Sequence, residues 1–188
     1  TQPSPAWQAT ARMAFARSFL NLTVLPDGQV LATGGGTTTD PANFSTAVYE
    51  AELWSPTTKA WTTMSRAQKP RLYHSTALLL PDARVLVAGG GRQNGRSQPD
   101  PADQPNAEIF SPPYLFKGAR PVISAAPSNV VYGTTFSVVT PDAARIGSVS
   151  LIALGAVTHA FNENQRFVPL TFDQAGGSLN VHAPANGN

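Results

Sequence analysis

The chain of 188 residues contains no cysteine and few charged side chains. Without cysteine, disulfide bonds and zinc–thiolate sites are excluded within the chain. Charged residues make up 13%, the formal net charge of +2 is scattered, and no run of lysine and arginine is available to follow a phosphate backbone. No apolar run approaches membrane-spanning length and no signal peptide is visible. Nucleic-acid binding and membrane insertion are therefore poor hypotheses.

Helical periodicity is also missing. No window of eleven residues shows a convincing 3.6-residue repeat, and the best candidate, residues 9–18, is short and uncapped. The chain has 17 prolines and 15 glycines, a share that is typical of short strands joined by turns, and its hydrophobic content of 41% permits a core. The sequence predicts an all-β protein.

Two sequence segments occur twice at nearly one offset. "LTVLPDGQVLATGGG" (22–36) aligns with "ALLLPDARVLVAGGG" (77–91), and "AELWSP" (51–56) aligns with "AEIFSP" (107–112). Each copy predicts two apolar strands around a Pro-Asp turn, glycines that allow positive φ or close backbone approach, and a third strand. In the first copy "KAWTTM" predicts a fourth strand. A period near 50 with a double glycine is typical of kelch repeats, so residues 1–119 are predicted to be kelch-type propeller blades.

Two blades cannot close a propeller, which takes about four to eight. The outer faces would be open sheet that is prone to pairing. We therefore expect the chain to be part of something larger, or to assemble with another polypeptide.

Residues 120–188 have a different texture, with strands every 8 to 12 residues and no double-glycine unit. This spacing predicts an immunoglobulin-like β-sandwich. About seven strands are wanted and five are expected, so the sandwich is predicted to be C-terminally incomplete. The expected strands are 122–124, 135–139, 148–154, 166–172 and 178–182.

Three side chains are candidates for metal chemistry: Tyr73, His74 and His159. Copper(II) prefers imidazole nitrogens and oxygen donors in a tetragonal arrangement. Neighbouring residues of a strand point in opposite directions, so Tyr73 and His74 share one metal only where the chain bends. His159 is expected on a loop rich in Asn and Gln. On spacing alone, a hydrogen-bonded histidine near each strand end is favoured over a metal site, and His182 is expected to be a surface or interface residue.

Three stretches carry a resemblance to a known family: "RLYHSTALLLPDARVLVAGGG", "NAEIFSPPYLFKGARP" and "GAVTHAFNENQRFVPLTF". In their order and spacing they resemble the C-terminal portion of the galactose oxidase and glyoxal oxidase family, the copper radical oxidases. The resemblance covers residues 14–188. It implies the last blades of a seven-bladed kelch-type β-propeller, followed by an immunoglobulin-like domain that sends a histidine to the copper.

The resemblance also implies roles for single residues. Tyr73 matches the axial tyrosine, which takes the substrate hydroxyl proton as general base. His74 and His159 match the two equatorial histidines. The family's fourth ligand is a second tyrosine that is cross-linked to a cysteine and holds the radical. No cysteine is present, and the other tyrosines do not match that position, so the chain would supply three of four copper ligands; these other tyrosines are Tyr49, Tyr114 and Tyr132.

The implied function is a secreted, extracellular oxidase. With a companion chain or the missing N-terminal propeller blades it would oxidise a primary alcohol, aldehyde or sugar with O2 and release H2O2. The alternative is a non-catalytic kelch and sandwich module that binds carbohydrate or a larger assembly, because a fold alone does not give chemistry. Arg17, Arg71 and Gln165 could lie near the substrate pocket, although salt bridges are the favoured role of both arginines.

Overall fold

The computed structural model describes residues 4, 6–41, 43–91 and 103–187. Within them the regular structure is β-strand apart from three short 3₁₀ turns, and the predicted all-β class is confirmed. The three turns are η1 (Phe44–Thr46), η2 (Pro113–Phe116) and η3 (Ala143–Arg145). No helix of the described residues is long and apolar enough to cross a membrane.

The chain divides into two compact units, and neither is contiguous in sequence. The repeat unit comprises Gln8–Pro112 and Ile152–Phe167, and the terminal unit comprises Thr1–Trp7, Pro113–Leu151 and Val168–Asn188. The segment that carries His159 thus belongs to the repeat unit. The proposed domain boundary after residue 119 stays a prediction.

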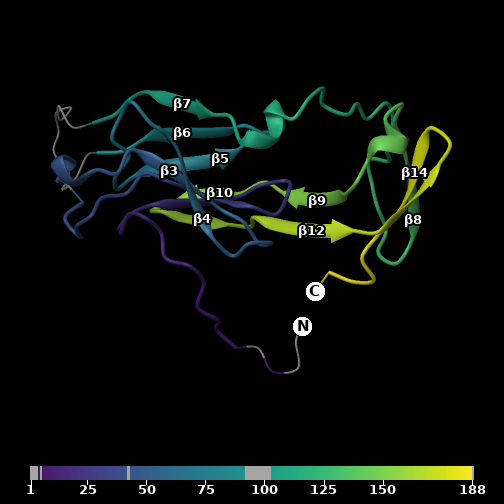
Figure 1. Ribbon diagram of the computed structural model, residues 1–188, viewed down its shortest axis with the longest axis horizontal. Helices are drawn as coiled ribbons and strands as arrows, with labels where there is room; N and C mark the ends of the chain where they lie inside the picture. Colours follow the sequence, from purple (N-terminus) through teal and green to yellow (C-terminus); the bar gives the residue numbers. More distant parts are fainter. Residues whose placement is uncertain (1–3, 5, 42, 92–102, 188) are drawn as a thin grey trace. The chain divides into compact units, whose positions relative to one another are not determined.

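The first sheet of the repeat unit has four antiparallel strands in chain order (Figure 1). They are β1 (Asn21–Val24), β2 (Val30–Thr33), β3 (Glu50–Trp54) and β4 (Trp61–Arg66). The β1–β2 connection is the Pro-Asp turn that the sequence predicts. In it Asp27 Oδ1 accepts from the backbone N of Gln29 at 3.1 Å, and Gly28 takes φ 80.

The second sheet repeats this plan with three antiparallel strands, β5-β6-β7. They are β5 (Ser75–Leu79), β6 (Val85–Gly89) and β7 (Ala107–Phe110). Its turn has the same construction, since Asp82 Oδ1 accepts from the backbone N of Arg84 at 3.1 Å and Ala83 takes φ 67. All the strands that the duplication predicted in 22–110 are therefore present.

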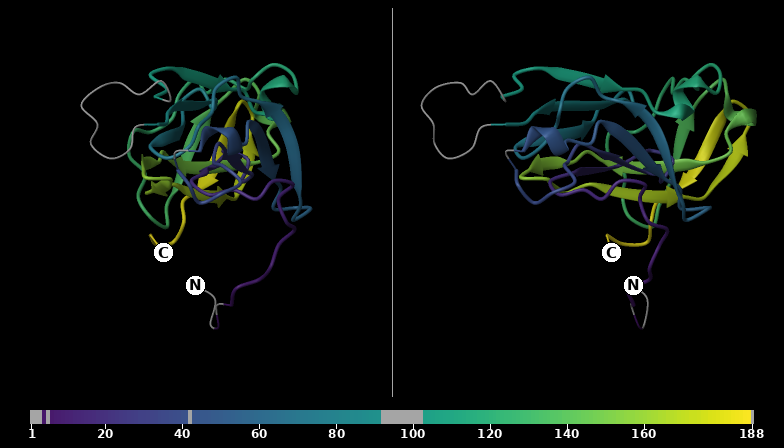
Figure 2. Two further views of the ribbon diagram at one scale, coloured as in Figure 1. Left: turned by 90° about the vertical axis from the view of Figure 1, so that its left-hand side faces the viewer. Right: turned by 60° about the vertical axis from the view of Figure 1, so that its left-hand side comes forward.

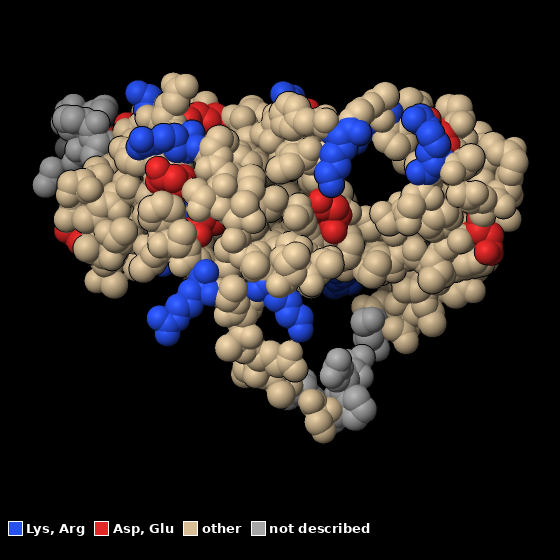
Figure 3. Space-filling model, in the orientation of Figure 1, with Lys and Arg blue, Asp and Glu red and all other residues tan. Residues whose placement is uncertain are grey.

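Buried positions alternate along β5 and β6, as expected for half-buried strands, whereas β2 and β3 each bury three residues in a row. The core of the repeat unit is formed by apolar side chains. The most buried ones are Leu25, Leu31, Ala32, Leu53, Leu72, Ala77 and Val85. β1 and β5 lie near one another, so the two sheets meet along their first strands. On the face shown in Figure 3, charged side chains are scattered among uncharged ones.

The terminal unit contains a three-stranded antiparallel sheet of order β13-β14-β8 (Figure 2). These strands are β8 (Thr135–Val139), β13 (Phe172–Ala175) and β14 (Ser178–His182). Its core contains Val138, Ala143, Leu179 and Val181. A separate ladder pairs β9 (Val149–Ala153) with β12 (Arg166–Leu170).

Three expectations for the C-terminal part were wrong. Residues 122–124 form no strand: the backbone N of Ser124 donates to the carbonyl oxygen of Val139, and that of Val122 donates to Asp142 Oδ2. The flanking prolines at 121 and 127 cannot donate to a ladder. The expected strand 166–172 is divided between β12 and β13. The expected long loop around His159 is shortened to a two-residue turn, because its flanks form a hairpin of β10 (Ala156–Thr158) and β11 (Phe161–Glu163).

Candidate metal centre

Tyr73 and His74 lie in a tight turn immediately before β5. The backbone N of Ser75 donates to the carbonyl oxygen of Leu72 at 3.0 Å, which makes Tyr73 and His74 the two central residues of a β-turn. His74 has φ 63, in the left-handed region that a type II turn requires at this position. The chain therefore bends where the sequence analysis required it to bend. The two rings stack, with centroids 4.0 Å apart and planes inclined by 29°.

The glycines at the end of β6 lie against this turn. The backbone N of Gly91 donates to the carbonyl oxygen of Tyr73 at 3.0 Å. Gly89 has φ 70, and a Cβ there would lie 3.1 Å from the carbonyl oxygen of His74. Close approach and positive φ both favour glycine, so the repeated glycine motif makes room for the turn.

His159 lies at the tip of the β10–β11 hairpin. Thr158 pairs with Phe161, which leaves His159 and Ala160 as a two-residue loop with φ 50 and 65. Positive φ at both loop residues is the pattern of a type I′ turn, which usually contains Asn and Gly. A histidine and an alanine there cost of order 1 kcal/mol each or more, and such strain clusters at functional sites.

The hairpin brings His159 to the Tyr73–His74 turn. Its ring centroid lies 5.7 Å from that of Tyr73 and 5.3 Å from that of His74. Metal–nitrogen bonds of about 2 Å require ligand rings within a few ångströms of one another, so these separations are compatible with one shared ion. His74 and His159 are exposed and Tyr73 is half-buried. The structure brings together the three residues that the sequence analysis selected.

The donors of such a centre would be two imidazoles and one phenol. Within the described residues, no group of three or more His, Cys, Asp or Glu side chains could hold a metal ion. A centre here therefore depends on the Tyr73 oxygen. Thr158 Oγ1 shares a hydrogen bond of 2.7 Å with His159 Nδ1, which leaves Nε2 as the ligand nitrogen of that ring. Hydrogen bonds of this kind fix the tautomer and orientation of metal-binding histidines.

Phe19 was not among the predicted site residues, and its ring packs edge-on against Tyr73 with centroids 5.4 Å apart. Phe19 also has positive φ, at 61. The signal that could have found it is the repeat, because Phe19 follows Arg17 by two residues as Tyr73 follows Arg71.

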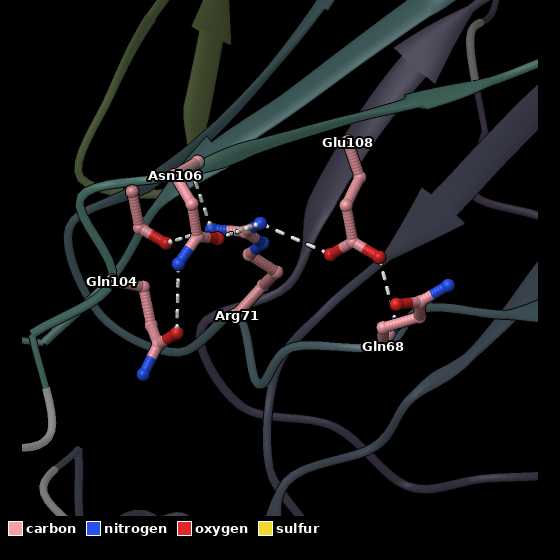
Figure 4. A network of polar contacts seen from close by, with 6 residues as sticks. Gln68, Arg71, Gln104, Asn106 and Glu108 are labelled. Carbon is pink, nitrogen blue, oxygen red and sulfur yellow. Dashed lines mark hydrogen bonds and ion pairs between the residues drawn. The ribbon is translucent and has the colours of Figure 1, made fainter.

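Arg71 has the structural role that was favoured for it (Figure 4). Its guanidinium donates to the carbonyl oxygens of Gly89 and Asn106 at 2.9 and 3.0 Å and pairs with Glu108 Oε2 at 3.0 Å. Arg17 likewise pairs with Glu52 Oε2 at 2.7 Å. Both arginines hold backbone together, and the preferred salt-bridge role is confirmed.

The two remaining polar residues considered from the sequence, Gln165 and His182, have partners outside the Tyr73–His74–His159 cluster. The side-chain amide of Gln165 forms a hydrogen bond with the backbone of β1: its Oε1 accepts from the backbone N of Val24 at 2.8 Å. His182 lies in the terminal unit, partly exposed, with Nδ1 on Thr135 Oγ1 at 2.9 Å and Nε2 on Asp173 Oδ2 at 3.0 Å. These contacts agree with a surface role for His182.

Comparisons with known proteins point to one family. A family model described as "Glyoxal oxidase N-terminus" matches residues 1–114, and one described as "Galactose oxidase-like, Early set domain" matches residues 120–188. The chain is 34% identical over 184 residues to a galactose oxidase from Gibberella zeae, covering 95% of this chain and 26% of that protein. It is also 34% identical over 183 residues to the aldehyde oxidase GLOX from Vitis pseudoreticulata, covering 91% of this chain and 35% of that protein.

A solved structure supports the same assignment. A fungal alcohol oxidase of the AA5 family, in complex with copper, matches with a TM-score of 0.84 and 32% identity over 95% of this chain and 38% of that one. The chain thus spans about a quarter to two fifths of these relatives. Because the glyoxal oxidase model covers more than half of its residues, this chain belongs to the galactose oxidase and glyoxal oxidase family.

Proposed function

We propose that this chain forms part of a secreted copper radical oxidase, to which Tyr73, His74 and His159 supply three of four copper ligands. The enzyme would oxidise a primary alcohol or an aldehyde. The observation that carries the proposal is the convergence of three rings from two distant segments, with centroids 4.0 to 5.7 Å apart. Imidazole and oxygen donors are a suitable set for copper(II). Membership of a family whose relatives include copper-bound and alcohol-oxidising proteins supports the choice of metal.

Each residue has a chemical task in this proposal. His74 and His159 act as neutral imidazole donors, and the Thr158 hydroxyl holds the His159 ring in place. Tyr73 takes the substrate hydroxyl proton as general base. Copper and a tyrosyl radical, when bound, would supply the redox chemistry: two electrons and two protons pass to O2 from the alcohol, or from the hydrate of the aldehyde, giving H2O2.

The fourth ligand and the radical tyrosine are proposed to come from a companion chain or from N-terminal propeller blades. The second sheet supports this idea, because within the described residues β7 pairs with β6 alone, whereas its counterpart β3 pairs on both edges. A sheet edge with unpaired backbone groups is a template for a further strand. We further propose that both sheets are kelch-type blades of a seven-bladed propeller and that residues 120–188 belong to an immunoglobulin-like sandwich.

Copper binding by the purified chain tests the metal centre. We expect one copper(II) ion per chain, measured by competition with a chelator of known affinity. His74→Ala and His159→Ala should each lower the affinity by about tenfold or more, since even residues that only support a ligand contribute 10- to 100-fold. Tyr73→Phe should change the absorption and paramagnetic resonance spectra of the bound ion.

His182→Ala is the matched control, because His182 is the third histidine of the chain and contacts other partners. It should leave the affinity unchanged. Equal affinities for the unmodified chain, His159→Ala and His182→Ala would contradict the centre and favour the non-catalytic binding module. Mass spectrometry for a companion chain with a thioether-linked tyrosine tests the source of the fourth ligand.

A further inference from the structure

The β10–β11 hairpin, which carries His159, is attached to the first sheet by the side chain of Gln165, just after β11. Gln165 Oε1 accepts from the backbone N of Val24 at 2.8 Å, and Gln165 Nε2 donates to the carbonyl oxygen of Leu22 at 3.2 Å. Residues 22 and 24 lie two apart on β1, an edge strand of the sheet, so their backbone groups face the same side. One primary amide therefore takes the place of a neighbouring strand on this edge.

Two further contacts reinforce this attachment. Asn162 Nδ2 donates to the same Leu22 carbonyl oxygen at 3.4 Å. Its side chain fills the space over Gly155, where a Cβ would lie 1.9 Å from Asn162 Oδ1. The ring of Phe167 packs over the β1–β2 turn, 3.1 Å from where a Cβ of Gly28 would lie.

The hairpin needs this support. β10 and β11 have three residues each, and a short two-stranded hairpin is marginally stable at best in water. Its loop also holds His159 and Ala160 at positive φ. Because the loop is strained and the ladder is short, the position of the imidazole depends on what holds the hairpin to its neighbours.

We infer that Gln165 is a positioning residue for His159: its two hydrogen bonds to β1 hold the hairpin so that the imidazole meets Tyr73 and His74. The inference rests on the proposed copper centre for its functional meaning. It makes the first sheet, which contributes no ligand, responsible for the geometry of the site. Gln165 was considered as a residue near the substrate pocket, and its amide forms hydrogen bonds with the backbone of β1.

The test uses the full chain and three variants. Gln165→Met keeps the length of the side chain and removes both hydrogen bonds. Gln165→Glu keeps an acceptor for the Val24 N–H and loses the donor to the Leu22 carbonyl oxygen, so its effect should be intermediate. Gln174→Met is the matched control, because Gln174 is an exposed glutamine on β13 of the terminal unit.

The first readout is amide hydrogen exchange in the metal-free chain. We expect Gln165→Met to raise the exchange rates of the Val24 amide and of residues 156–163, while the amides of β6 keep theirs. The second readout is copper(II) affinity, which should fall about tenfold, the lower end for supporting residues of a metal site. The paramagnetic resonance spectrum should then resemble that of His159→Ala, and Gln165→Glu should recover part of both effects.

The outcomes separate this inference from the proposed function. Unchanged exchange and unchanged copper affinity in Gln165→Met would overturn the positioning role, even if His159→Ala weakens copper binding. Faster exchange in the hairpin, with copper affinity insensitive to His159→Ala, would support the attachment and overturn the copper centre. If Gln165→Met does not fold, Gln165→Glu supplies both readouts, and its failure to alter either one would count against the inference.

Discussion

In both sheets of the repeat unit, an arginine precedes the first strand at the same distance. The side chains immediately before that strand, here called the entrance residues, differ between the two sheets. Three residues separate Arg17 from β1, and three separate Arg71 from β5. In the first sheet the last two of them are Phe19 and Leu20; in the second they are Tyr73 and His74. The comparison teaches that one scaffold serves both copies, whereas the side chains of the proposed metal centre occur in the second copy alone.

The shared scaffold is an arginine that ties the glycine end of the second strand to the third strand. The guanidinium of Arg17 donates to the carbonyl oxygen of Gly34 at 3.0 Å, and that of Arg71 donates to the carbonyl oxygen of Gly89 at 2.9 Å. Each arginine also meets a glutamate of the third strand, as described above. The network recurs without any ligand in the first sheet, so its role is to hold the fold.

The two networks differ in burial. Both side chains of the Arg17–Glu52 pair are 0% exposed, whereas the Glu108 side chain of the second pair is 26% exposed. The first pair has β4 beside it, and the second sheet has no fourth strand among the described residues. Removing one partner of a fully buried pair leaves an uncompensated charge. Arg71 is also buried, with its side chain 1% exposed, but removing the partly exposed Glu108 would open its guanidinium to water from that side.

The largest effect that we expect is on stability and distinguishes these two pairs. Glu52→Ala should lower the free energy of unfolding by about 3–5 kcal/mol, because it strands the buried Arg17 guanidinium. Glu108→Ala should cost about 1.5–3 kcal/mol, the range for hydrogen bonds to charged groups. Urea unfolding followed by tryptophan fluorescence measures both. Equal losses of unfolding free energy in Glu52→Ala and Glu108→Ala would show that the open edge of the second sheet does not lower the cost of removing Glu108.

The next effect concerns the equivalent glycines. A Cβ on Gly34, which has φ 66, would lie 2.3 Å from the carbonyl oxygen of Arg71, whereas on Gly89 the nearest atom is 3.1 Å away. Gly34→Ala should cost about 2–4 kcal/mol, and Gly89→Ala about 1–2 kcal/mol, because left-handed strain acts at both positions and the crowding is milder at Gly89. The same urea titration measures the loss of unfolding free energy in both variants. A larger loss for Gly89→Ala than for Gly34→Ala would contradict the difference in crowding at the two glycines.

A smaller change in stability accompanies the exchange of the entrance residues. The double variant Tyr73→Phe with His74→Leu copies the first entrance onto the second. It should change the free energy of unfolding by no more than about 1 kcal/mol, because the side chains are not core residues, and should abolish tight copper binding. Phe19→Tyr with Leu20→His should add no second copper site, since the chain has a single His159 hairpin. A second bound copper there would contradict this view of the repeat.

The smallest effect lies outside both repeats and serves as a reference. The backbone N–H of Val122, and then the side chain of Arg145, hold the pKa of Asp142 below its ordinary value of 3.8. A depressed folded-state pKa contributes stability that is present above pH 3.8 and is lost as pH falls through the lower value. Asp142→Asn should therefore reduce the acid sensitivity of unfolding below pH 3.8 and leave copper affinity at pH 7 unchanged. Unfolding at pH 7 and pH 3 checks the first expectation.

The repeat made much of the fold predictable. The Pro-Asp turns and the glycines recur in sequence, and strands of the correct type appear on either side of them in both copies. The predicted strand at residues 122–124 was wrong. An apolar stretch between prolines resembles a strand in sequence, but the prolines cannot donate hydrogen bonds to a neighbouring strand.

The candidate site was predictable in its residues but not in its geometry. Alternation along a strand would separate Tyr73 from His74, and only the positive φ of His74 shows how one turn presents both. The hairpin under His159 was missed because its loop has none of the Asn or Gly residues that usually mark such turns. Gln165 was named only as a residue that could lie near the substrate pocket, and its pairing with β1 has no local signature in the sequence.

The most direct test of the central claim is a crystal structure of the copper-loaded chain with anomalous diffraction measured at the copper edge. We predict one strong peak per chain within bonding distance of the Tyr73 oxygen, one nitrogen of the His74 imidazole and Nε2 of His159. A peak at His182, or separate weak peaks on individual histidines with none shared by the three rings, would contradict the account.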